Sequence, residues 1–423
     1  MVIDNIKDQL IVDNTFYITT IDKLPITSLS KISIIQQYVY SKYRWIFSIY
    51  ELSETWVAEN VDNIIKKYVR KWFQLPISAN IANLTFPTRK LGINFKFAKT
   101  IYQKSKLSVR RILKQSKNSE IRNLYQITSI KNIRSDEIIN SVTNNNQDLS
   151  PKQVSSKTDQ IFEKSKRNDS WNKFLGLKEQ NAIIKHIVSV CTPKLINMWQ
   201  VMIGRLPNNI VCFVRKGLIF SLPNRSNLFK WKITQDNKCS MCQQTETQLH
   251  VLSNCSKYLD RYKWRHDSIL KTILNKLSRS PREGVEIFAD LEGSNFRCTS
   301  DIFENMRPDI TVVIRNKVVV IELTVCFDTN TEKSRVYKQN RYQTLRNELL
   351  IAHDEFDVLY VEFTTSGFIG KNSYIAFNSF LRNLDVNQDR CIIKCMEVAI
   401  RGSYYVFCRR NKPWEVRELL NFY

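Results

Sequence analysis

The chain has 423 residues and a formal net charge of +24, from 64 Lys and Arg against 40 Asp and Glu. Its composition, 43% hydrophobic with only 9 Gly and 10 Pro, excludes a collagen-like or wholly disordered chain and allows roughly two or three globular domains. The excess of positive charge indicates a polyanionic partner, above all nucleic acid. The alternative is a solvated Lys-rich surface in a chain that is also rich in Asn and Ile.

The start of the chain, "MVIDNIKDQLIVDN", mixes charges and has no apolar core of a secretory signal. No stretch reaches the ~18 uncharged apolar residues that a membrane helix needs. We therefore expect no membrane association, a nuclear location (or a cytoplasmic one before import), and ten cysteines that are reduced or bound to metal.

The first part of the chain, residues 30 to 75, has helical periodicity. "NVDNIIKKYVRKWFQLP" places Ile65, Val69 and Trp72 on an apolar stripe and Lys66 and Arg70 on a basic side. The stripe predicts ordinary core. The basic side is either a nucleic-acid-binding surface or a solvated face.

Composition changes between residues 115 and 170, where Ser, Asn, Gln and Lys replace large apolar residues. This pattern predicts a mostly flexible polar linker with short helices around residues 121 to 125. Apolar helical patterns return after residue 171 and run into a group of cysteines.

That group is "CSMCQQTETQLHVLSNC", residues 239 to 255. Cys239 and Cys242 form a two-residue-spaced knuckle, and His250 and Cys255 follow on a short helix. Three thiolates and one imidazole are a standard tetrahedral ligand set for structural zinc. The alternative is a set of buried cysteines without a ligand.

Directly after the knuckle, a helix with a packed side and a basic side carries Arg265, His266 and Asp267. Asp267 can orient the His266 imidazole. Read alone, the three residues are also consistent with a surface charge cluster.

A hairpin is predicted in "RPDITVVIRNKVVVIELTV", where two β-branched runs flank a turn at Arg315 and Asn316. This register places Asp309 opposite Glu322, with the two Cβ atoms about 5 Å apart. Two carboxylates that close repel each other unless a cation lies between them, and a hard ion such as Mg²⁺ or Mn²⁺ prefers such ligands. The alternative is a hairpin with two unrelated acids near its open end.

The following segment predicts a helix that offers Lys338, Arg341 and Tyr342, and then a buried strand. Two acids on a hairpin and a cation on the next helix are what metal-assisted phosphodiester cleavage needs, because the cation can stabilise charge that develops on the phosphate.

Together these residues resemble the C-terminal part of site-specific non-LTR retrotransposon proteins with a restriction-like endonuclease. The shared features are the Cys-Cys-His-Cys knuckle, the Arg-His-Asp motif, and a Pro-Asp signature, Pro308 and Asp309, followed after twelve residues by Glu322. The resemblance extends from about residue 35 onward. It implies a mixed α+β fold with a C-terminal α/β nuclease of the PD-(D/E)xK class.

The resemblance also implies an organisation and a set of partners. The expected regions are a helical thumb-like region at 1–114, a flexible linker at 115–170, a helical domain with the knuckle at 171–280, and a restriction-like endonuclease domain at 281–423. The implied partners are double-stranded target DNA, the RNA of the element, and a polymerase-bearing chain. Nucleic-acid contacts are expected at Arg265, His266, Asp267, Arg307, Tyr342, Lys66 and Arg70.

Two departures from the family pattern bear on activity. The chain contains no Asp-Asp pair, so we expect no reverse transcriptase active site and interpret the chain as a C-terminal fragment or truncated copy. Arg341 stands where the family helix has Lys, and Lys338, one turn earlier, is the nearest substitute. Arginine keeps the charge but does not shuttle protons.

Three hypotheses follow from the sequence. The chain is a metal-dependent DNA endonuclease that nicks target DNA for target-primed insertion, or a catalytically decayed nucleic-acid-binding remnant, or an interaction scaffold that kept the fold.

Overall fold

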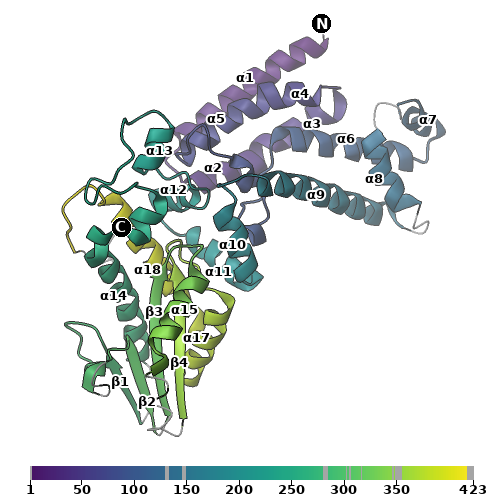
Figure 1. The fold of residues 1–423 in the computed structure, drawn as a ribbon. Helices are drawn as coiled ribbons and strands as arrows, with labels where there is room; N and C mark the ends of the chain where they lie inside the picture. Colours follow the sequence, from purple (N-terminus) through teal and green to yellow (C-terminus); the bar gives the residue numbers. More distant parts are fainter. Residues whose placement is uncertain are drawn as a thin grey trace. The chain divides into compact units, whose positions relative to one another are not determined.

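The computed structural model describes residues 2–128, 133–144, 149–279, 284–301, 303, 306–315, 317–344, 347 and 355–416 (Figure 1). The chain divides into two compact units, Met1–Leu177 and Lys178–Tyr423. The sequence had predicted four regions instead.

The described residues of the first unit form helices joined by loops, with no strand among them. Its longer helices are α1 (Val2–Lys23), α2 (Ser28–Ile34), α3 (Tyr40–Ile49), α5 (Asn63–Trp72), α6 (Ala98–Gln115), α7 (Ser119–Ile127), α8 (Ile133–Thr143) and α9 (Pro151–Leu175), with a short helix α4 (Glu54–Trp56) before a π-helical segment (Val57–Asp62). The predicted stripe of α5 is confirmed, because Ile65, Val69 and Trp72 are buried while Lys67 is exposed.

The start of α6 depends on a buried carboxylate. Asp62, which is 2% exposed, accepts hydrogen bonds from the backbone N–H groups of Ala98 (2.6 Å) and Lys99 (3.2 Å). The first N–H groups of a helix have no partner within the helix, so this side chain satisfies two of them. Burial raises the pKa of Asp62 to about 6, although the two N–H groups lower it.

The predicted flexible linker, residues 115 to 170, is wrong for most of its described residues. They form α7, α8 and most of α9, and α9 begins with a capping box between Ser150 and Gln153. Few apolar side chains suffice because they are concentrated in one small core that joins Leu107, Ile139 and Phe162. Amino-acid composition does not show how these apolar residues are spaced, so it could not predict this core.

A buried ion pair also ties this region to α6. Arg110 donates to both carboxylate oxygens of Asp136 on α8, at 2.9 and 2.6 Å. Such a bidentate pair fixes both position and orientation of the partner helix. Residues 115 to 170 therefore belong to the helical unit and do not separate two domains.

The second unit combines helices with one four-stranded sheet. The helices are α10 (Ala182–Val190), α11 (Pro193–Ile203), α12 (Asn208–Gly217), α13 (Arg225–Lys230), α14 (Leu259–Leu277), α15 (Thr331–Arg341), α17 (Lys371–Asn383) and α18 (Gln388–Cys408), and the strands are β1 (Val285–Ala289), β2 (Ile310–Ile314), β3 (Lys317–Cys326) and β4 (Glu355–Thr364). The predicted mixed class is thus confirmed at this level.

The strand order is β1-β2-β3-β4 (Figure 1), with β1 and β2 antiparallel, β2 and β3 antiparallel, and β3 and β4 parallel. The predicted hairpin register is confirmed, because Ile314 pairs with Lys317 and Ile310 with Ile321. Arg315 has a φ of 52°, as a tight hairpin turn requires. Asn316, the other predicted turn residue, lies outside the described residues.

Helices α14 and α18 pack against each other, and α14 also contacts β3. Their close approach depends on Gly402, where a Cβ atom would lie 2.7 Å from Cγ of Arg265. Arg265 is 1% exposed and donates to the Ser403 hydroxyl at 3.0 Å. This contact fixes the rotation of α14, and therefore the direction in which the next side chain, His266, points.

The Asp62 cap gives a testable consequence. Asp62→Ala should lower the free energy of unfolding by about 1–2 kcal/mol, as loss of an N-cap typically does. Asp62→Asn keeps an acceptor oxygen and should cost less. Because the folded protein holds the Asp62 proton up to a pH of about 6, ionisation costs stability as pH rises from about 4 to about 6. Urea unfolding at several pH values should show that the free energy of unfolding of Asp62→Asn rises relative to that of the wild type between pH about 4 and about 6. A difference between the two proteins that does not change with pH would contradict this prediction.

Candidate functional site

The four predicted zinc ligands lie together in the second unit. The ligand atoms of Cys239, Cys242, His250 and Cys255 are all within 4.8 Å of one another. Cys242 Sγ lies 3.3 Å from His250 Nε2 and 3.8 Å from Cys255 Sγ. Within the described parts of the chain, this is the group of three or more Cys, His, Asp or Glu side chains placed closely enough to hold a metal ion, and its ligand types fit structural zinc.

The local fold of the cluster explains the two-residue spacing. Cys239 N–H donates to the Gln244 carbonyl at 2.7 Å, and Gln243 N–H donates to the Cys239 carbonyl at 2.9 Å. Gln243 has a φ of 63°, which turns the chain back sharply. Burial would raise the pKa of the Cys239 thiol, but the backbone N–H groups of Met241 and Cys242 bring it below its usual value. The turn thus favours a thiolate, the form that binds metal.

The cluster is joined to the start of α14 by two tyrosines. The Tyr262 hydroxyl accepts from the Cys255 N–H at 3.1 Å and lies 2.9 Å from the His250 carbonyl. Tyr258 OH donates to the Arg410 carbonyl and lies 3.9 Å from Cys239 Sγ. The helix that follows the knuckle is therefore held in place by the same segment that carries the ligands.

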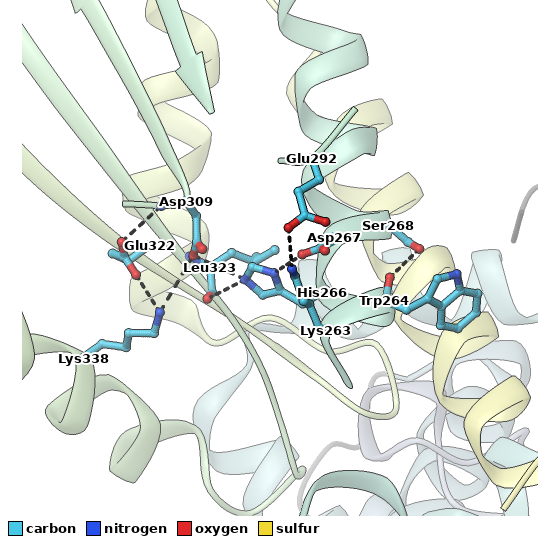
Figure 2. A network of polar contacts seen from close by, with 10 residues as sticks. All are labelled: Lys263, Trp264, His266, Asp267, Ser268, Glu292, Asp309, Glu322, Leu323 and Lys338. Atoms are coloured by element: carbon cyan, nitrogen blue, oxygen red, sulfur yellow. Dashed lines mark hydrogen bonds and ion pairs between the residues drawn. The ribbon is translucent and has the colours of Figure 1, made fainter. Parts of the chain in front are cut away.

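The predicted carboxylate pair lies at the open end of the β2–β3 hairpin. Asp309 N–H donates to Glu322 Oε1 at 3.2 Å, and Asp309 Oδ2 accepts from Leu323 N–H at 2.7 Å. Glu322 is 1% exposed and shares its face of β3 with Val318 and Val320, because side chains alternate along a strand. The two carboxylates lie on the same side of the hairpin (Figure 2).

Lys338 on α15 contacts both acids. Its Nζ lies 2.6 Å from Glu322 Oε2 and 3.9 Å from Asp309 Oδ2 (Figure 2). Arg341, the other candidate cation, is exposed, and its guanidinium lies 5.8 Å from the centre of the Tyr342 ring. Of the two, the structure brings Lys338 to the carboxylates.

A second helix reaches the same carboxylates. His266 on α14 places Nε2 3.3 Å from Asp309 Oδ2 and 3.2 Å from the Leu323 carbonyl oxygen, while Nδ1 lies 3.0 Å from Asp267 Oδ1 (Figure 2). The predicted role of Asp267 in orienting the imidazole agrees with this contact.

The electrostatics of the site follow from this crowding. Burial, together with the charge of Asp309, raises the pKa of Glu322 to about 7, although Lys338 acts in the other direction. Burial would raise the pKa of Asp309 as well, but His266 and Lys338 bring it below its usual value. Burial would lower the pKa of His266, yet Asp309 and Asp267 raise it to about 10. Asp309 therefore links the protonation of Glu322 to that of His266.

Three predicted nucleic-acid contacts require correction or restriction. Arg265 is buried between α14 and α18, so it cannot reach a nucleic acid. Tyr342 is 4% exposed and packs in a core with Val318 and Val320, so it is not a surface aromatic. Both residues were expected outside because their sequence neighbours are charged; tertiary packing decides otherwise. Arg307 is exposed and lies 2.8 Å from Asp290.

Of the other predicted contacts, His266 and Asp267 lie at the carboxylates, and Lys66 and Arg70 lie in the first unit. Lys66 and Arg70 line a shallow hollow of about 470 Å³ on α5, together with Asn63, Lys67, Lys71, Leu75 and Ile77. Lys71 is paired with Asp22 at 2.6 Å. The hollow is therefore a mainly basic surface that also includes the apolar side chains of Leu75 and Ile77.

Sequence reasoning placed His266 in a binding motif and missed its contact with Asp309. It also missed the Leu323 carbonyl, because a backbone oxygen leaves no residue-type signal. The available clue was position: His266 lies about midway along a helix that follows the knuckle, and such a helix must pack on something.

Comparisons with known proteins do not assign the chain to a family. The chain matches no protein-family model, and no curated protein resembles it closely enough to count as a match. Among the described residues, no helix combines the length and apolar character needed to cross a membrane.

The cluster of Cys239, Cys242, His250 and Cys255 makes a prediction about metal content. Protein purified without chelator should contain about one zinc ion per chain, since three thiolates and an imidazole bind zinc tightly. Cys242→Ser should lose the metal and local order around the start of α14, while Cys408→Ser, at an exposed cysteine outside the cluster, should not. Elemental analysis with hydrogen exchange checks both. If the wild-type protein contains no zinc, or if the two variants have the same zinc content, the cluster is not a zinc site.

Proposed function

We propose that this chain is a retrotransposon-derived, metal-dependent DNA endonuclease whose second unit contains a restriction-like nuclease domain at residues 281–423. The observation that carries the proposal is the convergence of Asp309, Glu322 and Lys338 at one end of a mixed sheet. A half-buried acid directly before β2, a buried acid on β3 and a lysine from the crossover helix are a donor set suited to phosphodiester cleavage.

The donor set fits a divalent ion. Glu322 Oε2 and Asp309 Oδ2 both lie within reach of the Lys338 ammonium, so a cation already occupies the space between them. Oxygen ligands of this kind suit Mg²⁺ or Mn²⁺. When bound, such an ion would supply Lewis acidity toward the phosphate and lower the pKa of a water molecule.

The side chains themselves would divide the remaining work. Asp309 and Glu322 would hold the ion, and the N–H of Leu323 fixes the carboxylate of Asp309 for that purpose. Lys338 would move from the carboxylate to the phosphate and stabilise the developing negative charge. Arg341, exposed one turn later, would contact the DNA backbone.

The same proposal gives the other features their roles. Zinc in the cluster would be structural and would fix the start of α14. The net charge of +24 and the basic hollow on α5 would hold the phosphate backbone of target DNA or of the element RNA. Action on chromosomal DNA implies a nuclear location, and insertion would need a polymerase-bearing partner chain.

A second candidate function is a nucleic-acid-binding remnant without catalysis. It is favoured by the 2.6 Å contact of Lys338 with Glu322, which could serve as a permanent ion pair in place of a metal ion. The two functions share every binding feature and differ in metal-dependent strand cleavage.

Nicking of supercoiled plasmid in Mg²⁺ or Mn²⁺ separates them. Asp309→Asn and Glu322→Gln each remove a charged ligand, so the nicking rate should fall about 100-fold or more while DNA binding persists. Asp357→Asn is the matched control, because this exposed acid on β4 pairs only at the surface, 2.9 Å from Lys317. A wild-type chain that never nicks, or variants that nick equally, would leave the binding remnant.

The two candidate cations are separated in the same assay. Lys338→Ala should reduce nicking strongly, whereas Arg341→Ala should weaken DNA binding with a smaller effect on the rate at saturating DNA. Lys333→Ala, on the exposed side of α15, is the control. A larger loss in Arg341→Ala, or a gain in Arg341→Lys, would instead assign the catalytic cation to position 341.

Nucleic-acid binding should depend steeply on salt, because phosphate contacts release counterions. Lys66→Ala and Arg70→Ala should each weaken binding and reduce the slope of log affinity against log salt by roughly 1. Lys7→Ala serves as the comparison, because Lys7 lies on α1 and does not line the hollow. Titrations by fluorescence anisotropy at several salt concentrations provide the measurement. An unchanged slope in both variants would show that the α5 surface is only solvated.

A further inference from the structure

Several large aromatic side chains are exposed on the first unit, where α1 contacts the π-helical turn η1 (Ile35–Val39) that leads into α3. Phe16 on α1, Tyr38 in the turn and Trp45 on α3 are 63%, 54% and 70% exposed. Single exposed apolar side chains are ordinary on a protein surface, but a group of large rings on neighbouring elements indicates a binding surface.

The rings contact one another and a cation. Tyr17 packs edge-on against Phe16 and Tyr38, with ring centroids 5.7 and 6.2 Å apart. The Lys42 ammonium lies 5.0 Å from the centre of the Tyr38 ring and 5.4 Å from that of Tyr17. Trp45 follows Lys42 by three residues on α3, a spacing that places both on one side of the helix. These five residues, here called the aromatic platform, combine exposed rings with a positive charge.

The charge around the platform favours a polyanion. The sequence has no Asp or Glu between Asp22 and Glu51, and it has four Lys or Arg there. Asp13, the acid of α1 closest in sequence to the rings, accepts a hydrogen bond from the Gln9 amide at 2.8 Å. Aromatic rings also occur in protein interfaces, but Lys is depleted there, whereas nucleic-acid-binding surfaces combine cations for phosphates with rings for bases. The platform therefore suits a nucleic acid better than a protein.

Exposed ring faces select unpaired bases. In a duplex each base is stacked between its neighbours, whereas a single strand can place its bases on protein rings. The hydroxyl groups beside the rings donate within their own helices, from Thr15 to the Ile11 carbonyl at 2.8 Å and from Ser41 to the Tyr38 carbonyl at 2.6 Å. These protons are therefore not offered to a ribose 2′-OH, the group by which proteins distinguish RNA from DNA.

We propose that the aromatic platform binds single-stranded DNA, with unpaired bases stacked on Trp45, Tyr38 and Phe16 and a phosphate held by Lys42. The inference rests on the proposed function, because cleavage of one target strand frees an end that can unpair. It assigns different ligands to two surfaces of the first unit. The hollow on α5 is lined by Lys, Arg, Asn, Leu and Ile and holds a phosphate backbone of any kind, while the platform requires unpaired bases.

The first test uses the full-length wild-type chain and a single DNA strand that carries 5-iodouracil, a photoreactive base that crosslinks to a ring on which it stacks. After irradiation, mass spectrometry of the digested chain should place the crosslinks on Phe16, Tyr38 or Trp45. This result does not depend on the folding of any variant.

The second test measures the affinity for an oligothymidylate of about 12 nucleotides, within the usual range of single-strand site sizes. Trp45→Ala and Tyr38→Ala should each weaken binding by about 10-fold, because each removes a stacking surface. Trp45→Phe should keep most of the affinity, because a ring remains. None of the three should change the affinity for a duplex of the same length. Phe229→Ala, at an exposed ring of α13 outside the platform, is the matched control and should change neither affinity.

The outcomes separate this inference from the nuclease proposal. Crosslinks elsewhere, together with unchanged affinity in Trp45→Ala and Tyr38→Ala, would overturn the platform and leave the nuclease proposal intact. Tighter, Trp45-dependent binding of an RNA strand of the same sequence would overturn the choice of DNA. Loss of self-association in Trp45→Ala, with unchanged affinity for the strand, would make the rings a protein interface instead. Platform-dependent binding by a chain that never nicks DNA would support the inference and end the nuclease proposal.

Discussion

The mutual repulsion of Asp309 and Glu322 is the constraint around which the second unit is arranged. Two carboxylates at paired positions of a hairpin, one of them 1% exposed, cannot both stay ionised at little cost without positive charge nearby. The chain provides that charge twice, from Lys338 on α15 and from His266 on α14. The crossover helix and the helix after the knuckle are therefore both bound electrostatically to one end of the sheet.

This arrangement joins the cysteine cluster to the carboxylates through a single element. Helix α14 begins a few residues after Cys255, is anchored there by Tyr258 and Tyr262, and carries His266 to Asp309. The buried contact between Arg265 and α18 fixes its rotation. A change in the position of the cluster would consequently move His266 relative to Asp309, because a rigid helix transmits a rotation along its whole length.

The first unit follows a different principle. Its polar segments fold because small apolar cores are reinforced by buried pairs such as Arg110 with Asp136 and by the Asp62 cap of α6. Buried pairs of this kind contribute to orientation more than to net stability, since desolvation offsets much of the attraction. The basic hollow on α5 remains at the surface, where a high positive charge favours polyanions.

The sequence by itself determined the features that depend on short spacing. Two residues between Cys239 and Cys242 define a knuckle, and a two-residue turn fixes the pairing that puts Asp309 opposite Glu322, because strand periodicity allows no other partner once the turn is set. The apolar stripe of α5 was predictable for the same reason.

Only the tertiary structure decided which charged residues meet. Arg265 and His266 are neighbours in sequence, yet one is buried against α18 and the other reaches Asp309, because successive side chains on a helix point about 100° apart. Lys338 and Arg341 are one turn apart, but Lys338 contacts Glu322 while Arg341 is exposed. Residues 115 to 170 have the composition of a linker, yet most of those that the structure describes fold as helices, since a few apolar side chains meet a core supplied by α6. Long-range packing of this kind leaves no periodic signal in the sequence, so composition could not predict it.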